Sequence, residues 1–240
     1  MKKKTLLALA LFACYLAQAQ TPLSTAILDI TLQCAGGTGN RTGIAFNPDQ
    51  QLYYSVNAGN TTYPIETFNN NGAQVSTVSQ GFDYRGAWWN PNTSVLEGNG
   101  HANLGVWIQD LDASFYALGT GTNAISGVSG PDSQSSANYD SDTDEILYYF
   151  NGSIYSYDRA THNLITTSVI TGLPVATSNL NSNSVAYTGV IGFEIGVYDY
   201  INKAFYFINK TTGAYVMTCQ LPATSPAAAS FKMGFANGRL

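Results

Sequence analysis

The sequence predicts an all-β fold built from repeated four-stranded units, and three observations support this prediction. The first is a stretch of four short runs, residues 136–140, 145–151, 154–158 and 163–169, in which Tyr and Ile alternate with polar residues between turn-forming Asp, Asn and Gly. The second is an aromatic anchor that recurs every 43 to 50 residues, and the third is a recurring turn. Together they predict a β-propeller, because one blade is a four-stranded meander of about 40 to 50 residues.

The N-terminus predicts a secretory signal peptide over residues 1–19, followed by a propeller domain over residues 20–240. Lys2 to Lys4 precede a short apolar run, and Ala17-Gln18-Ala19 provides a small-x-small cleavage site. A lipobox that ends in Cys14 is the alternative, although Phe12 is bulky for such a site. No later apolar run is long enough to span a bilayer. We therefore expect a secreted, periplasmic or cell-surface protein without a transmembrane segment.

The composition excludes one class of partner and leaves one redox question open. Charged residues are 10% of the chain and the formal net charge is -5, so no basic patch exists to bind a phosphate backbone, and nucleic acid is not an expected partner. Cys34 and Cys219 are the two cysteines that follow the signal peptide. They either form one disulfide or remain two free thiols buried in strands, because spacing alone does not bring their Cα atoms together.

Two independent marks place the repeat along the chain. The first strand of each unit ends in an aromatic residue at Phe46, Trp89, Tyr139, Tyr187 and Phe235. The third strand ends in Asn or Asp and leads into a turn that ends in Gly or His, at residues 69–72, 158–162 and 209–213, with a degenerate copy that ends at Asp110. An Asn or Asp side chain opens such a turn by binding its own backbone, and Gly supplies the positive φ. The marks predict four blades and part of a fifth.

This turn, with its aromatic, Asp or Asn, Thr and Gly residues, resembles that of secreted bacterial β-propellers of the YVTN and quinoprotein-like group. The resemblance covers nearly all of the chain after residue 19, but it concerns repeat residues alone and implies an architecture rather than an activity. The sequence lacks the motifs that mark WD40, kelch and sialidase propellers, so membership of those groups is not supported.

The two ends of the propeller domain predict how the ring closes. Residues 26–33 form an expected strand in the place of a fourth strand, and such an N-terminal strand completes the last blade of a closed propeller. The fifth unit stops at Leu240, five residues after Phe235, so its second and third strands are incomplete. We expect the chain to be a partial form of a longer product whose next residues complete that blade. Open blade edges would then be prone to pairing with another copy.

Candidate sites for catalysis are scarce in this sequence. Only two histidines are present. His162 aligns with Gly213 at the turn position where positive φ is favoured, which indicates a turn residue. His101 lies in a glycine-rich segment that departs from the repeat, and functional residues tend to lie on such loops. A mixed zinc site, a Gly-x-Ser-x-Gly elbow and a complete dinucleotide fingerprint are not supported.

One acidic cluster has the spacing of metal ligands. Asp140, Asp142 and Asp144 alternate within one turn, and carboxylates so arranged can converge on a hard cation such as Ca²⁺. The cluster departs from the EF-hand pattern, since Glu145 stands where Gly is required. A solvated acidic turn without metal is the alternative, and no other cofactor is expected.

An aromatic surface in the second unit supplies the candidate ligand site. Arg85 begins a first strand, and first strands surround the central channel of a propeller. Trp88 and Trp89 point to opposite faces of that strand, so we expect at most one of them to pack between blades. Arg85, Trp88 and His101 together are the expected binding residues for an anionic or sugar-like ligand. An Arg bonded to backbone carbonyls and a Trp that packs between blades are the structural alternative.

The sequence thus predicts a secreted binding or scaffold module whose ligand lies on the loop face or at the channel mouth. That ligand is a glycan, a small anionic molecule or a protein. The alternative is a propeller enzyme, such as a lactonase, glycan lyase or hydrolase, that uses carboxylates and a metal. The fold alone does not distinguish the two, because propellers support many unrelated functions.

Overall fold

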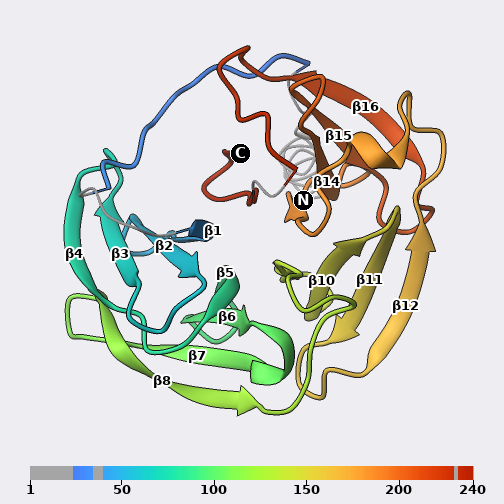
Figure 1. Cartoon of the computed structure of the whole chain (residues 1–240). Helices are drawn as coiled ribbons and strands as arrows, with labels where there is room; N and C mark the ends of the chain where they lie inside the picture. Colours follow the sequence, from blue (N-terminus) through green and yellow to red (C-terminus); the bar gives the residue numbers. More distant parts are fainter. Residues whose placement is uncertain (1–23, 35–39, 230–231, 240) are drawn as a thin grey trace, which may run out of the picture.

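The computed structural model describes residues 24–34, 40–229 and 232–239. They form four four-stranded antiparallel sheets arranged as the blades of a propeller (Figure 1). Blade 1 contains β1 (Asn40–Asn47), β2 (Leu52–Ala58), β3 (Pro64–Asn69) and β4 (Gln74–Ser79). Blade 2 contains β5 (Tyr84–Asn90), β6 (Val95–Gly100), β7 (Val106–Leu111) and β8 (Ala117–Ile125). Blade 3 contains β9 (Asn138–Asp140), β10 (Glu145–Phe150), β11 (Ser153–Asp158) and β12 (Leu164–Val169). Blade 4 contains β13 (Ala186–Tyr187), β14 (Ile195–Asp199), β15 (Ala204–Ile208) and β16 (Tyr215–Gln220).

Within each blade, strands consecutive in sequence pair with each other, and the first strand lies nearest the central axis (Figure 1). Among the described residues, helix is limited to two short 3-10 turns, η1 (Ala102–Leu104) and η2 (Thr177–Asn179). No helix in this part of the chain is long and apolar enough to cross a membrane. The predicted all-β propeller with four blades is therefore confirmed. Residues 1–19 and Cys14 lie outside the described residues, so the signal peptide and the lipobox stay predictions.

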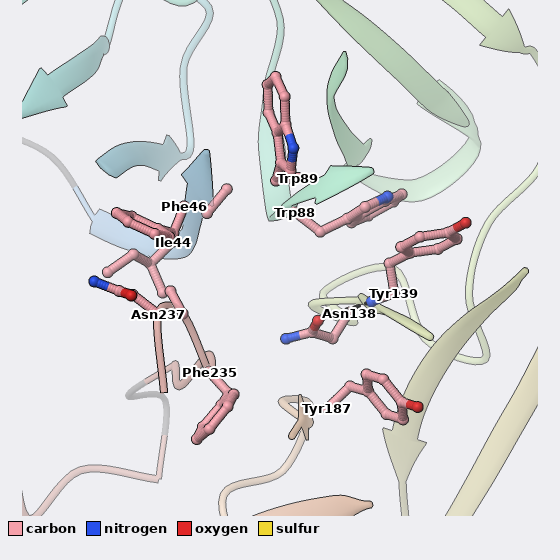
Figure 2. A pocket seen from close by; sticks show the side chains of 11 residues that line it. Ile44, Phe46, Trp88, Trp89, Asn138, Tyr139, Tyr187, Phe235 and Asn237 are labelled. Carbon is pink, nitrogen blue, oxygen red and sulfur yellow. Dashed lines mark hydrogen bonds between the residues drawn. The ribbon is translucent and has the colours of Figure 1, made fainter. Parts of the chain in front are cut away.

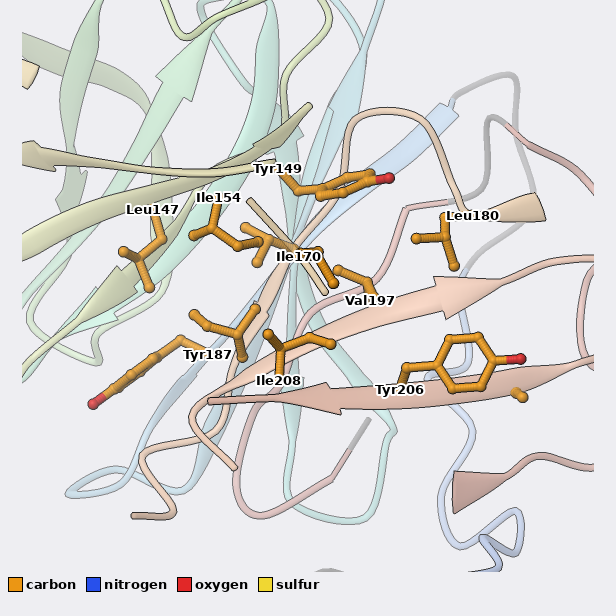
Figure 3. Close-up of a cluster of buried hydrophobic side chains, with 12 residues drawn as sticks. Leu147, Tyr149, Ile154, Ile170, Leu180, Tyr187, Val197, Tyr206 and Ile208 are labelled. Carbon is orange, nitrogen blue, oxygen red and sulfur yellow. The ribbon is translucent and has the colours of Figure 1, made fainter. Parts of the chain in front are cut away.

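The hydrophobic core lies between neighbouring blades. The cluster between blades 3 and 4 joins Leu147 and Ile154 to Val197 and Ile208, all of which are buried (Figure 3). Further clusters join blade 1 to blade 2 and blade 2 to blade 3. Both faces of a blade are thus apolar, because each face packs against a different neighbouring blade. The middle strands therefore lack the alternation of apolar and polar residues that is expected of a half-exposed sheet.

The recurring turn after the third strand has the predicted backbone. Gly72, His162 and Gly213 all have positive φ, at 81°, 57° and 70°. His162 is therefore a turn residue, as predicted, but it is also buried, and its Nε2 lies 3.0 Å from the Tyr148 hydroxyl. The degenerate copy in blade 2 was misplaced. β7 continues to Leu111, and its turn opens at Asp112, whose Oδ1 accepts the Tyr116 N–H at 2.9 Å.

Two extended segments lie between blade 4 and blade 1. Residues 24–34 cross the outside of the ring (Figure 1), with Thr25 bridged to Gln220 and Gln33 bridged to Ala73. These bridges are isolated, so residues 26–32 form no strand and β16 is itself the fourth strand of blade 4. The segment lies on the outside of the ring, where the sequence predicts a fourth strand. It does not pair along its length with a neighbouring strand, so the prediction that residues 26–33 form a strand that completes the last blade was wrong.

The second segment, residues 232–239, lies on the inner side of the ring. Ser184 Oγ donates to the Met233 carbonyl at 2.9 Å, and Gly234 packs against Ile44. These residues belong to no sheet, so the partial fifth blade and its completion beyond Leu240 stay predictions. Cys34 and Cys219 are both free thiols, which corresponds to the unpaired alternative.

Candidate functional site

A small cavity lies on the propeller axis, at the C-terminal ends of the innermost segments (Figure 2). Its volume is about 130 Å³. Four inner strands and the segment 232–239 supply its lining residues, which include the aromatic residues Phe46, Trp88, Trp89, Tyr139, Tyr187 and Phe235. Their rings point outward, away from the cavity, whereas the Asn138 side chain points toward it (Figure 2). Asn138 and Asn237 add amide groups.

The repeat itself builds this cavity. The five aromatic anchors of the repeat, Phe46, Trp89, Tyr139, Tyr187 and Phe235, are all among its lining residues. The four anchors in strands are the last or next-to-last residues of β1, β5, β9 and β13. The first strands of neighbouring blades run in the same direction, so equivalent positions lie at the same height on the axis. A mark that was used to align the blades therefore also locates the cavity.

The acidic turn holds two of these rings in place. Asp142 Oδ2 accepts a hydrogen bond from the Tyr187 hydroxyl at 3.0 Å, and Asp144 Oδ1 accepts one from the Tyr139 hydroxyl at 2.7 Å. Burial, followed by the carboxylates nearby, raises the pKa of both tyrosines. Both rings therefore stay neutral hydrogen-bond donors with a fixed orientation.

Asp140 has a different partner from the other two aspartates. Its Oδ1 accepts the backbone N–H of Asp142 at 2.9 Å, and its Oδ2 forms an ion pair with Lys210 of blade 4. Burial alone would raise the pKa of the Asp140 carboxyl, but hydrogen bonds from Lys210, Tyr187 and Thr143 lower it. The carboxylate is thus ionised and links blade 3 to blade 4.

The predicted calcium ligands therefore do not meet at one centre. Asp140, Asp142 and Asp144 bind three different partners, and no group of three His, Cys, Asp or Glu side chains in the described part of the chain is arranged to hold a metal ion. The turn is one copy of a five-residue turn that also occurs at residues 47–51 and 90–94, where Asn47 and Asn90 accept the same backbone hydrogen bonds. These contacts favour the alternative of a turn held by hydrogen bonds, and calcium binding stays a prediction.

Trp88 and Trp89 both pack between blades, so the expectation that at most one of them does so was wrong. Trp89 belongs to the cluster of blades 1 and 2, and Trp88 to the cluster of blades 2 and 3. The expectation failed because it treated one face of blade 2 as exposed, whereas neighbours cover both faces. Trp88 Nε1 also donates to Glu97 Oε2 at 3.0 Å, which fixes the indole ring.

Arg85 and His101 lie away from the aromatic cavity. Arg85 stands near the start of β5, and its Nη1 donates to Asp83 Oδ1 at 2.5 Å and to the Tyr84 carbonyl at 2.7 Å. His101 binds the Asp83 carbonyl through its backbone N–H at 2.9 Å. The structure therefore brings Arg85 and His101 to the same end of the channel and places Trp88 toward the other end.

Comparisons with known proteins support the fold. No protein-family model matches the sequence, and no curated protein matches it. Among solved structures, glutaminyl cyclase of Myxococcus xanthus is similar with a TM-score of 0.56 and 12% identity, over 82% of this chain and 81% of that one. At this identity the likeness concerns the fold alone.

Two further structures are similar over shorter parts of their own length. A Lactobacillus plantarum protein has a TM-score of 0.43 and 13% identity over 79% of this chain and 58% of that one. A chain of a nidogen/laminin complex has a TM-score of 0.43 and 13% identity over 74% of this chain and 62% of that one.

Proposed function

We propose that this protein is an exported binding module of the YVTN and quinoprotein-like type and that its axial cavity takes one sugar ring of a glycan. The observation that carries the proposal is a small axial cavity at the ends of the innermost strands, into which the Asn138 side chain points (Figure 2). Amide and backbone polar groups in a small cavity bind the hydroxyls of a sugar, so this lining suits a ligand rich in hydroxyl groups.

The size of the cavity limits the ligand. Its volume of about 130 Å³ is smaller than the roughly 300–1,000 Å³ of pockets for drug-sized molecules. A single terminal ring is therefore a better match than the interior of a long chain. Asn138 is the residue that we expect to bind the ligand directly. Its Oδ1 accepts the Tyr139 N–H at 2.8 Å, which fixes the amide, while its Nδ2 makes no hydrogen bond to any described residue and can donate to a ligand.

The lining favours binding over the enzymatic alternative. Among the described residues that line the cavity, none is a carboxylate, histidine or thiol, the groups on which a lactonase, lyase or hydrolase would rely for proton transfer or nucleophilic attack. The likeness to glutaminyl cyclase does not extend beyond the fold, so cyclisation of an N-terminal glutamine is an outcome to be tested.

Tryptophan fluorescence offers a direct test, because Trp88 and Trp89 line the cavity while Trp107 packs elsewhere, against Phe82. A Trp107→Phe variant would be titrated with a panel of monosaccharides and disaccharides. We expect a saturable change in emission for at least one sugar. The change should disappear in Asn138→Asp, which keeps the acceptor for the Tyr139 N–H but replaces the free amide donor.

Two results would overturn the proposal. One is a full panel without a saturable response from a folded protein. The other is an unchanged affinity in the Asn138→Asp variant. Turnover of a sugar, a lactone or an N-terminal glutaminyl peptide by the same preparation would support the enzymatic alternative instead.

A further inference from the structure

The end of the channel opposite the aromatic cavity gathers charged groups that the proposed function does not use. Arg85 and Lys232 both lie toward the starts of innermost segments, whereas the cavity lies at their ends. Lys232 Nζ lies 3.3 Å from the carbonyl oxygens of Gln134 and Asn183, which precede the first strands of blades 3 and 4. The ammonium group therefore lies between the entries to blades 3 and 4, at the end of the ring opposite the cavity.

Lys232 has no carboxylate partner among the described residues. Its two contacts are backbone carbonyls at long hydrogen-bond distances, and the nearby Asp132 is engaged by the side-chain amide of Asn183 at 3.0 Å. Burial, then the positive charge of Arg85, lowers the pKa of Lys232 to about 8, against the opposing effect of Asp132. The two cations are thus close enough to repel each other.

A count of donors shows what is left for a ligand. Arg85 uses Nε on Gln134, both hydrogens of Nη1 on Asp83 and Tyr84, and one hydrogen of Nη2 on Asp83. A guanidinium has five N–H groups and an ammonium has three, so one N–H of Arg85 Nη2 and one of Lys232 Nζ remain free. The side-chain carbonyl of Asn183 in the same cluster is buried without a partner.

We propose that Arg85 and Lys232 together bind the carboxylate of a small organic acid at this mouth of the channel. A carboxylate has two oxygens and can accept one hydrogen bond from each cation. Its charge removes the repulsion between the two side chains. The free Asn183 Oδ1 suits a hydroxyl or amine donor near the carboxylate.

The charge of Lys232 gives the site a pH dependence of definite sign. An anion favours the protonated amine, so binding raises the pKa of Lys232 and takes up protons near pH 8. For a site that needs the charged amine, a lysine pKa of about 8 reduces affinity by roughly tenfold between pH 7 and pH 9. Arg85, Asp83, Asp132 and His101 are the other charged or titratable groups at this mouth, so the variants must isolate Lys232.

Sodium acetate is a suitable probe, with sodium chloride of equal ionic strength as its control. In protein labelled with ¹³C-lysine, the side-chain resonance of Lys232 would be followed from pH 6.5 to 10 in each salt. We expect a higher midpoint in acetate than in chloride. The Nε–H resonance of Arg85 should shift with acetate concentration and reach saturation.

Two substitutions complete the test, with thermal melting as the check that each variant folds. Lys232→Met should weaken acetate binding at least tenfold at pH 7. Lys232→Arg should bind within about threefold of the parent and lose the pH dependence between 7 and 9, because a guanidinium stays charged there.

Equal midpoints in acetate and chloride, or unchanged acetate binding in Lys232→Met, would overturn the proposal. Asn138→Asp changes only the aromatic cavity and should leave acetate binding intact, so the two proposals fail separately.

Discussion

The ion pair between Arg159 and Glu97 should make a large contribution to stability. Removal of Arg159 should cost more free energy of unfolding than removal of the Glu97 charge. Glu97 is fully buried in β6, where it accepts hydrogen bonds from Trp88 at 3.0 Å and Asn90 at 3.2 Å. Arg159 of blade 3 completes the site by donating from Nε at 3.1 Å and from Nη2. The Arg159→Met variant would leave a buried carboxylate with two neutral donors.

The structure sets the size of this effect. Loss of one partner from a buried pair costs about 3–5 kcal/mol, and we expect the lower end because the Arg159 side chain is 18% exposed. Each kcal/mol lowers Tm by about 2–4 °C in a protein of this size, so Arg159→Met should melt roughly 6–12 °C below the parent. Glu97→Gln leaves the charge on Arg159, the less buried of the two partners, and should cost only about 1 kcal/mol.

Urea unfolding monitored by far-UV circular dichroism would measure both variants and the double variant Glu97→Gln/Arg159→Met. The double variant should be more stable than Arg159→Met alone, because it contains no unpaired buried charge. Arg239→Met is the matched control, since its pair with Asp29 is exposed on both sides and should be without measurable effect. The reasoning is refuted if Arg159→Met costs less than Glu97→Gln.

Four further outcomes are expected. Gly213→Ala should destabilise the fold by more than about 2 kcal/mol, since it adds a Cβ 2.3 Å from the Val169 carbonyl at a φ of 70°, whereas Gly172→Ala has similar φ and open space and should cost only about 1 kcal/mol in urea unfolding. Burial lowers the pKa of His162 below its ordinary 6.5, so the unfolded chain takes up the proton first, and urea midpoints should fall as pH decreases from about 6.5. The His162→Asn variant should show a smaller fall, and an unchanged pH profile in that variant would contradict the reasoning. Deletion of residues 24–33 should abolish cooperative unfolding and promote aggregation, because it exposes the edge and the apolar side chains that Ile30 and Leu32 cover; a variant that melts like the parent would disprove this. Melting curves in saturating calcium and in chelator should coincide, because all three aspartates are engaged, and a gain of about 2.7 kcal/mol at a hundred times Kd would restore the calcium hypothesis.

The sequence predicts the architecture well because the repeat marks have a direct structural cause. The aromatic anchors must lie at one height on the axis, so their spacing follows the length of a blade. The misplaced turn in blade 2 shows where this breaks down. The pairing of β7 with β8 changes register between Gln109 and Leu111, and the turn therefore opens at Asp112 instead of Asp110. No pattern of residue types in the sequence indicates this shift.

The candidate site was harder to predict, because it required distances rather than patterns. Arg85 and Trp88 are three residues apart, but a strand rises about 3.3 Å per residue, so roughly 10 Å separate them and they belong to different ends of the channel. The aromatic anchors did contain the signal for the cavity, although they were used only for alignment. Lys232 was also visible, as the charged residue at a position where the other units have Gly43, Gly86, Ser136 and Ser184.

The five-residue turns that border the aromatic cavity have a consequence for how the protein can change over evolution. In each turn an Asn or Asp side chain binds the backbone at the first position, and the last position has positive φ: 55° at Gln51, 56° at Ser94 and 56° at Asp144. Between them lie residues 48–50, 91–93 and 141–143, of which Asn92, Asp142 and Thr143 make side-chain hydrogen bonds. The side chains at the other intervening positions are not needed for the backbone shape. New side chains can therefore be introduced around the rim, by natural variation or by a graft in the laboratory, while the scaffold beneath them keeps its form.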